Sequence, residues 1–283
     1  MSSDPTAFAT NHLRTHGFDW YAALQFAAAD KRSACIVVFA YLVEIERIRS
    51  LISDPMPGEI RLQWWRDTLS GTTHGAVEAN PLAAALLQAI EHHSIPTAPL
   101  LAVLDARTFD LYDDVMPTMT DFEGYAGEVW SGPMSLAASI LSGESPARFA
   151  DVAGHGGVAL AVARTLENLP IWVGRGQCFL PTEIMQQYGL TREMLQQQQP
   201  AGELEQTLRA FVTYGLEHLD KAREASSNLS GSTNPVWLPF TLAERTLSEA
   251  HNWSADPYQS ALTTPRWRKL YRLWRASKRM PVF

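Results

Sequence analysis

Three aspartates near the middle of the chain have a spacing that could support metal chemistry. Asp110, Asp113 and Asp114 close an apolar stretch that begins after Pro99. Carboxylate oxygens are the ligands that Mg²⁺ prefers, so the D-x-x-D-D pattern taken alone resembles a magnesium-binding motif. A solvated acidic helix end before the proline at position 117 would account for the same residues. The sequence leaves both interpretations open.

Near the end of the chain, basic residues flank a set of apolar residues that recur at helical spacing. Seven of the 23 Lys and Arg residues fall within residues 266–279. The apolar residues at helical spacing are Trp267, Leu270, Tyr271 and Trp274, and the flanking basic residues include Arg268, Arg272 and Arg275. This pattern suits a helix that lies on an anionic membrane or on an acidic partner. The alternative is an ordinary helix that packs its apolar face on the core.

Apolar periodicity predicts the helices that must position such residues. Between residues 30 and 52 the apolar side chains recur with the spacing of one helix face. They are Ala34, Val37, Val38, Tyr41, Ile45, Ile48 and Ile52. Two prolines and a glycine within residues 54–58 end this helix, and a second helix is expected to stop at Gly71. Strand-like alternation is nearly absent, so the sequence predicts an all-α fold.

Composition excludes several classes of protein. The 283 residues are 46% hydrophobic and 19% charged, which is enough apolar material for a sizeable core. The net charge of −7 gives no overall basic excess, so no nucleic-acid partner is expected. The two cysteines, Cys35 and Cys178, lie in apolar runs and are expected to be core residues rather than a disulfide. Glycine-rich phosphate loops, nucleophile-elbow motifs and zinc-ligand spacings are absent from the sequence.

Residues 30–71 resemble the first diagnostic region of the squalene/phytoene synthase family, the head-to-head prenyl transferases. The matching residues are Arg32, Ala34, Phe39, Ala40 and the Trp65-Arg66 pair. In the family this helix ends in an aspartate-rich motif that binds Mg²⁺. This chain has Glu46 and Ser50 at the two aspartate positions. The resemblance brings Arg47, Arg49 and Arg164 close to Glu46, where they would repel Mg²⁺ and tend to pair with this carboxylate.

Residues 151–181 resemble the family's second diagnostic region. The residues in register are Gly157, Ala159, Arg175, Gly176, Phe179, Leu180 and Pro181. The family's asparagine falls at Arg164, and its two aspartates fall at Asn168 and Trp172. Pro170 also interrupts the helix there. Of the four aspartate positions in the two regions, only Glu46 retains a carboxylate.

The resemblance implies a single-domain, isoprenoid synthase-type helical bundle around a central cavity. We expect this domain to span residues 17–283, after a flexible N-terminal lead of residues 1–16. The N-terminus has neither the apolar core of a signal peptide nor an Arg-rich transit sequence. The expected location is cytoplasmic, with a peripheral position on the inner membrane if the C-terminal helix binds lipid.

Within the family, the chain resembles the branch of the mitochondrial complex I assembly factor. The residues that fit this branch are Glu44, Ile48, Ser53, Arg61, Gln63 and Trp65. This resemblance implies a non-catalytic protein with a partner in respiratory complex assembly and no required cofactor. Two alternatives stay open, an isoprenoid transferase that joins prenyl diphosphates and a carrier of a lipid or isoprenoid ligand.

An active enzyme would need a rearranged diphosphate site with Mg²⁺. The metal ligands would then be Glu46, Asp110, Asp113 and Asp114. Arg47, Arg49 and Arg164 could hold the diphosphate directly, because a guanidinium group forms bidentate hydrogen bonds with phosphate oxygens.

Overall fold

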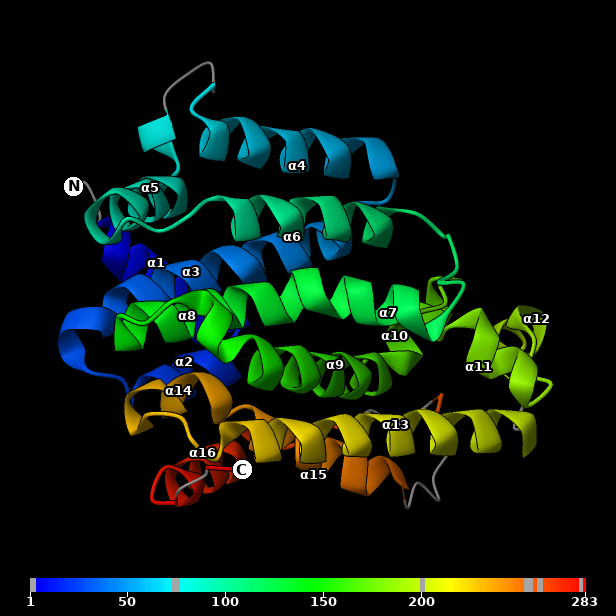
Figure 1. Cartoon of the computed structure of the whole chain (residues 1–283). Helices are drawn as coiled ribbons and strands as arrows, with labels where there is room; N and C mark the ends of the chain where they lie inside the picture. The colour runs from blue at the N-terminus through cyan, green and yellow to red at the C-terminus, as the bar shows by residue number, and fades with distance from the viewer. Residues whose placement is uncertain (1–3, 73–76, 199–201, 252–256, 259–261, 280–281) are drawn as a thin grey trace. The chain divides into compact units, whose positions relative to one another are not determined.

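The computed structural model describes residues 4–72, 77–198, 202–251, 257–258, 262–279 and 282–283. Within these ranges every regular element is a helix, and no strand occurs (Figure 1). The predicted all-α class is therefore confirmed, whereas the central cavity stays a prediction. The chain forms two compact units, and each takes its residues from three separate stretches of the sequence.

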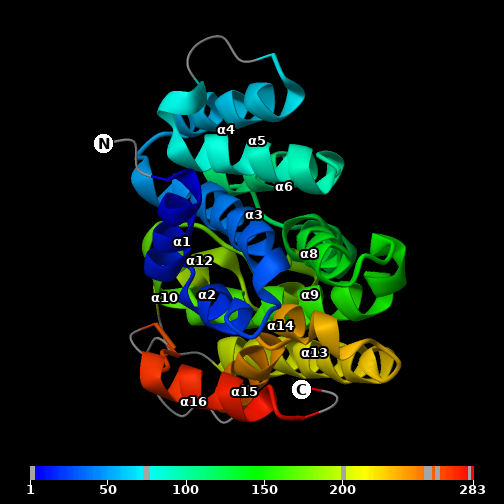
Figure 2. The ribbon, with the colours of Figure 1, turned by 90° about the vertical axis from the view of Figure 1, so that its left-hand side faces the viewer.

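The first unit comprises residues 1–112, 132–150 and 229–239. Its α-helices are α1 (Pro5–His16), α2 (Phe18–Leu24), α3 (Ala29–Arg47), α4 (Pro55–Ser70), α5 (Pro81–His93), α6 (Ala98–Thr108), α8 (Gly132–Ser142) and α14 (Asn234–Trp237). Every residue from 34 to 43 of α3 is buried. A helix that is apolar on all sides needs neighbours on all sides, and α3 contacts α1, α2, α5, α6 and α8. Figure 2 shows several of these helices around α3.

The second unit comprises residues 113–131, 151–228 and 240–283. Its α-helices are α7 (Met119–Ala126), α9 (Ala150–Glu167), α10 (Leu169–Gly174), α11 (Thr182–Gln187), α12 (Arg192–Gln196), α13 (Gly202–Ser226), α15 (Phe240–His251) and α16 (Arg266–Ala276). The long helix α13 contacts α11 and α15, and α15 in turn contacts α16. The position of α16 in this unit therefore depends on α15.

Two glycines let the helices of the second unit approach closely. A Cβ atom on Gly156 of α9 would lie 2.1 Å from Cζ of Phe240. A Cβ atom on Gly215 of α13 would lie 2.9 Å from Cγ1 of Val162 on α9. Both distances are too short for carbon atoms that are not bonded. At these two contacts a larger residue would have to displace the neighbouring side chain, whereas glycine fits as the structure stands.

The helix ends predicted in residues 30–71 are largely confirmed. Helix α3 ends at Arg47, and the chain continues as a short 3₁₀ turn (Ile48–Leu51) instead of an α-helix through Ile52. Helix α4 begins with a proline at its first position, where the missing N–H costs nothing. It ends at Gly71, whose φ of +72° is the left-handed conformation that favours glycine.

The expectation of a flexible lead over residues 1–16 is wrong for residues 5–16, which form α1. The side chain of Asp4 caps this helix by accepting a hydrogen bond of 3.0 Å from the backbone N–H of Thr6. Ala9 and Leu13 are completely buried, and α1 contacts α3 and α5. The segment is mostly polar, and its apolar stripe is narrow. The packing of α1 was therefore not evident from the sequence.

Replacing Leu13 with alanine tests whether α1 is an integral part of the first unit. We expect Leu13→Ala to lower the free energy of unfolding by about 3 kcal/mol, because it leaves a cavity in a fully buried site. The exposed Thr15 on the same helix provides the control, and Thr15→Ala should change the free energy by less than about 0.5 kcal/mol. Equal effects of the two substitutions in urea denaturation would show that α1 does not pack as described.

Candidate functional site

The first degenerate motif lies at the C-terminal end of α3, in the first unit. The carboxylate of Glu46 lies 3.8 Å from Nη2 of Arg107, which projects from α6. Nη1 of the same guanidinium donates a hydrogen bond of 2.8 Å to Oδ2 of Asp110. The side chains of Arg107 and Asp110 are only 10% and 8% exposed. Arg107 therefore stands between two carboxylates, one of which is the retained Glu46.

The neighbouring arginines do not pair with Glu46, contrary to expectation. Arg47 lies 3.7 Å from Glu44, and its carbonyl oxygen accepts a hydrogen bond of 2.7 Å from Oγ of Ser50. The buried Nε of Arg49 has no hydrogen-bond partner among the described residues. Glu46 instead meets an arginine that is 61 positions further along the chain, a contact that helix spacing could not predict.

The second degenerate motif lies in the second unit, where α9 ends and α10 begins. Asn168 lies in the chain between the last residue of α9 and the first residue of α10. Its side chain donates a hydrogen bond of 2.9 Å to the carbonyl oxygen of Arg164. Arg164 itself pairs with Glu167 at 3.1 Å. Trp172 is buried and donates its indole N–H to the carbonyl oxygen of Thr165 at 2.9 Å. The predicted interruption at Pro170 is confirmed, since α10 begins at Leu169.

The donor set at these positions does not fit a magnesium cluster. Mg²⁺ prefers carboxylate oxygens and water. Ser50 and Asn168 both use their side chains as donors to backbone carbonyls, and Trp172 offers only an indole N–H. The described part of the chain contains no group of three or more His, Cys, Asp or Glu that could hold a metal ion.

The predicted aspartate cluster is divided between two environments. Asp110 is buried against Arg107 in the short 3₁₀ turn after α6. Asp113 and Asp114 are exposed, in the irregular segment that follows. A guanidinium between Glu46 and Asp110 opposes a divalent cation at that place, because like charges repel at short range.

Both cysteines are free and buried, which confirms their expected place in the core. Burial raises the pKa of the Cys35 thiol to about 12. Burial also raises the pKa of Cys178. Neither thiol is therefore a reactive thiolate at neutral pH.

The second unit contains a cluster of titratable groups that was not evident from the sequence. Nδ1 of His155 lies 3.2 Å from Nδ1 of His218, and Nε2 of His218 lies 3.8 Å from the carboxylate of Glu123. The hydroxyl of Tyr214 donates a hydrogen bond to the same carboxylate. Burial, followed by the nearby His155, lowers the pKa of His218, whereas burial and the bond to Glu123 raise the pKa of Tyr214. These residues come from three helices, so no local motif could have indicated the cluster.

Helix α16 confirms the predicted C-terminal helix, and its apolar stripe faces outward. Trp267, Leu270, Tyr271 and Trp274 are between 47% and 65% exposed. The residues that pack inward are Leu273 and Ala276. These two positions lie on the side of the helix opposite the four exposed residues. The alternative in which the predicted stripe packs on the core is therefore wrong.

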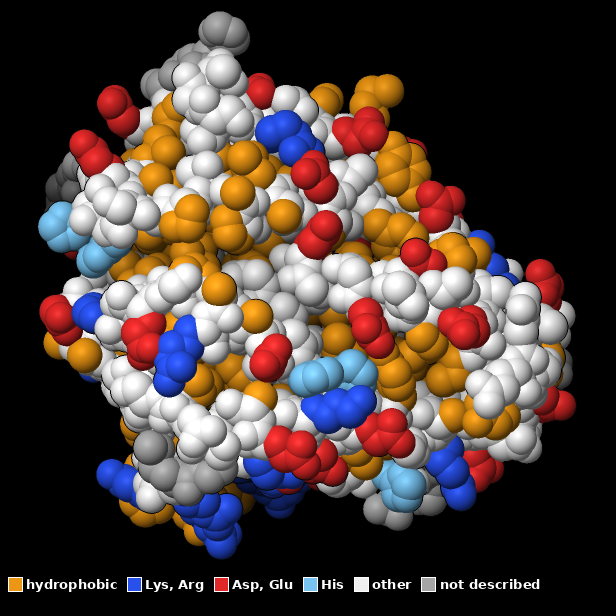
Figure 3. All heavy atoms as spheres, in the orientation of Figure 1, with side chains coloured by type: hydrophobic (Ala, Val, Ile, Leu, Met, Phe, Trp, Pro, Cys, Tyr) orange, Lys and Arg blue, Asp and Glu red, His pale blue; other side chains and the backbone are white. Residues whose placement is uncertain are grey.

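Positive charge gathers over α16, as the blue side chains at the lower left of Figure 3 show. A cavity of about 690 Å³ lies beside this helix, with Arg268, Arg272 and Arg275 among its lining residues. Arg223 and Arg245 line the same cavity from α13 and α15. The sequence predicted the basic residues of α16, but their meeting with arginines from other helices depends on the tertiary fold.

Comparison with protein families gives a match over nearly the whole chain. The model of the squalene/phytoene synthase family matches residues 13–272. Assembly factor 6 of NADH dehydrogenase (ubiquinone) complex I from Homo sapiens is 23% identical over 266 residues, which cover 92% of this chain and 80% of the human protein.

Enzymes of the family are also similar to this chain. Presqualene diphosphate synthase from Rhodopseudomonas palustris is 23% identical over 176 residues, which cover 62% of each chain. The crystal structure of the squalene synthase HpnC from Alicyclobacillus acidocaldarius superposes with a TM-score of 0.74 at 17% identity. That match covers 88% of this chain and 93% of the other. The structural similarity confirms the predicted isoprenoid synthase-type fold.

Substitution of Arg107 tests the charge network at the first motif. We expect Arg107→Met to lower the free energy of unfolding by about 3 kcal/mol, because it removes the guanidinium that pairs with the buried carboxylate of Asp110. The control Arg47→Met removes a more exposed pair and should cost less than about 1 kcal/mol. Adding Asp110→Asn to Arg107→Met should restore part of the loss. A double variant no more stable than Arg107→Met in guanidinium denaturation would contradict this account.

Proposed function

Because this chain belongs to the squalene/phytoene synthase family, we propose that it is a non-catalytic member that acts in the assembly of respiratory complex I. The family match confirms the resemblance identified in the sequence. The observation that carries the proposal is the set of side chains at the four aspartate positions, which are Glu46, Ser50, Asn168 and Trp172.

Ionisation of a prenyl diphosphate leaves pyrophosphate, and metal ions held by carboxylates neutralise the charge that develops on this leaving group. Here one carboxylate remains, and it faces the guanidinium of Arg107. The polar groups of Ser50, Asn168 and Trp172 are engaged with backbone carbonyls. These contacts support the proposal that the motif side chains do not bind the Mg²⁺ ions that would hold a diphosphate.

The extent of the sequence matches supports the assembly role. The human assembly factor aligns over 92% of this chain, whereas presqualene diphosphate synthase from Rhodopseudomonas palustris aligns over 62% at the same identity. We infer that this chain shares the role named for the assembly factor, and that its helical frame presents a surface to proteins of the forming complex.

An enzyme assay tests the absence of catalysis. With farnesyl or geranylgeranyl diphosphate and Mg²⁺, we expect no pyrophosphate release above the rate without protein, while an active squalene synthase gives steady turnover in the same buffer. Steady release by this chain would overturn the proposal and support a prenyl transferase with a rearranged metal site.

A complementation experiment tests the assembly role directly. Deleting the gene should reduce the amount of fully assembled complex I on native gels. Both the wild-type chain and Glu46→Gln should restore it, because an assembly role does not need the remaining motif carboxylate. Normal assembly in the deletion strain would argue against the role, and failure of Glu46→Gln alone would point to a chemical function of that carboxylate.

We also propose that α16 binds the surface of an anionic membrane, which would give the chain a cytoplasmic, peripheral position at the inner membrane. Its exposed face carries two tryptophans, a tyrosine and a leucine, and residues 266–279 contain seven basic and no acidic residues. A helix with this combination suits the boundary between anionic headgroups and acyl chains. None of the helices in the described ranges has the length and apolar character needed to cross a membrane.

Vesicle binding tests this surface. We expect Trp267→Ser combined with Trp274→Ser to weaken binding to vesicles of phosphatidylcholine and phosphatidylglycerol by at least about tenfold, because both rings are exposed and would insert into the interface. Ile171→Ser is the control, since Ile171 is a similarly exposed apolar residue on another helix. An equal loss of vesicle affinity in the control, or no vesicle binding by the wild type, would show that α16 does not bind a membrane.

A further inference from the structure

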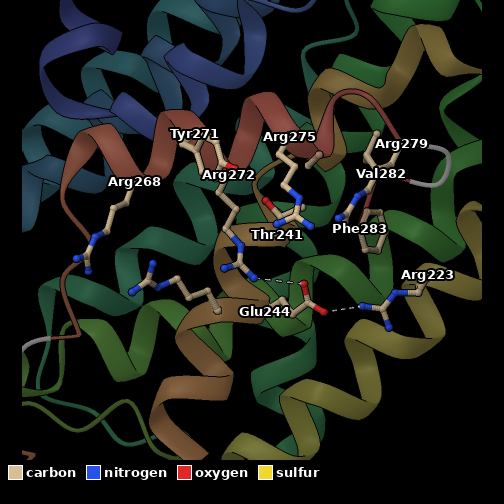
Figure 4. A pocket seen from close by; sticks show the side chains of 12 residues that line it. Arg223, Thr241, Glu244, Arg268, Tyr271, Arg272, Arg275, Arg279, Val282 and Phe283 are labelled. Atoms are coloured by element: carbon tan, nitrogen blue, oxygen red, sulfur yellow. Dashed lines mark hydrogen bonds and ion pairs between the residues drawn. The ribbon is translucent and has the colours of Figure 1, made fainter.

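The cavity beside α16 is lined by arginine side chains from several parts of the second unit (Figure 4). We call it the arginine pocket, and its arginines are Arg223, Arg245, Arg268, Arg272, Arg275 and Arg279. Arg268, Arg272 and Arg275 lie on α16, and their spacings of four and three residues place them on one side of the helix. Figure 4 shows the side chains of Arg272 and Arg275 extending from α16 toward α15.

Positive charge in the arginine pocket is only partly balanced. Glu244 of α15 pairs with Arg223 at 3.0 Å and with Arg272 at 3.8 Å. Arg245 pairs with a different carboxylate, that of Glu249. Within the described ranges, the three remaining arginines have no carboxylate partner. They are Arg268, Arg275 and Arg279.

Such an arrangement is suited to a multiply charged anion. Neighbouring guanidinium groups repel one another, and an anion between them relieves that repulsion. Arginine also matches phosphate in geometry, because its planar group donates two parallel hydrogen bonds to phosphate oxygens. Thr241 and Tyr271, which both carry a hydroxyl group, line the same pocket. The volume of about 690 Å³ is large enough for a small ligand or a lipid headgroup.

We propose that the arginine pocket is a binding site for a phosphate group with two or more negative charges. The group could belong to a phospholipid headgroup or to a soluble phosphate compound, and both would be recognised by the same arginines. The exposed Trp267, Leu270 and Trp274 occupy the adjoining outer face of α16, which favours the lipid headgroup. The site is independent of the assembly role, since it requires only that the second unit is folded.

The test variant is Arg275→Gln combined with Arg279→Gln. Neither residue pairs with a carboxylate of the described chain, so the substitutions leave no acidic group without its partner. The matched control is Arg266→Gln combined with Lys269→Gln. It removes the same charge from the same segment, but neither residue lines the pocket. Circular dichroism and thermal unfolding of both variants should match those of the wild type.

Inorganic pyrophosphate is the first probe, measured by calorimetry on the full chain at physiological ionic strength. We expect saturable binding of about one pyrophosphate per chain. The pocket variant should lower this affinity by about tenfold or more, because it removes two charged donors. The control variant should lower it by less than about twofold, since screening limits the effect of distant charges.

Vesicles distinguish the two sources of phosphate. If the ligand is a headgroup, the pocket variant binds phosphatidylcholine vesicles that contain phosphatidic acid more weakly than the control does, and pyrophosphate competes with them. If pyrophosphate binding depends on the pocket but vesicle binding does not, the site takes a soluble compound. The proposal is overturned if the wild type does not bind pyrophosphate, or if the pocket and control variants lose equal affinity. A failed complementation experiment leaves these outcomes unchanged.

Discussion

The burial of residues 34–43 of α3 is the constraint on which the first unit depends. Residues 34–43 expose none of their faces, so the unit must surround them with other helices. Tyr41 of α3 is one point of contact with α6, because its hydroxyl donates a hydrogen bond of 2.9 Å to the carbonyl oxygen of Leu100. This contact fixes α6 beside α3. The same arrangement brings Arg107 of α6 to Glu46 at the end of α3.

The polar side chains at the motif positions find their partners within the protein itself. A lone carboxylate or amide near a buried helix end needs a partner, since unpaired polar groups in such places destabilise the fold. Here Arg107 pairs with Glu46 and Asp110, while Asn168 and Trp172 bond to carbonyls of α9. In this chain the two motif regions thus contribute to the stability of their own units through direct protein contacts.

The sequence was informative where local patterns determine structure. Periodicity predicted α3, α4 and α16, and the glycine at position 71 was correctly identified as a helix stop. Burial of α1 was missed because only Ala9 and Leu13 mark its inner face. The pairing of Glu46 with Arg107 and the histidine cluster of α9 and α13 join residues far apart in the chain, so they depend on tertiary packing that no spacing reveals.

Charge distribution links the outer face of α16 to the arginine pocket. The whole chain has a net charge of −7, yet residues 266–279 contribute seven positive charges and no negative ones. The remainder therefore carries a net charge of −14. An anionic membrane would repel most of this surface and attract α16, so long-range electrostatics alone would orient the chain during its approach. Once the helix is in contact, its tryptophans would meet the interface while Arg268, Arg272 and Arg275 lie at its flank. A phosphate group in the arginine pocket would then convert a general attraction to negative charge into a defined contact with one headgroup.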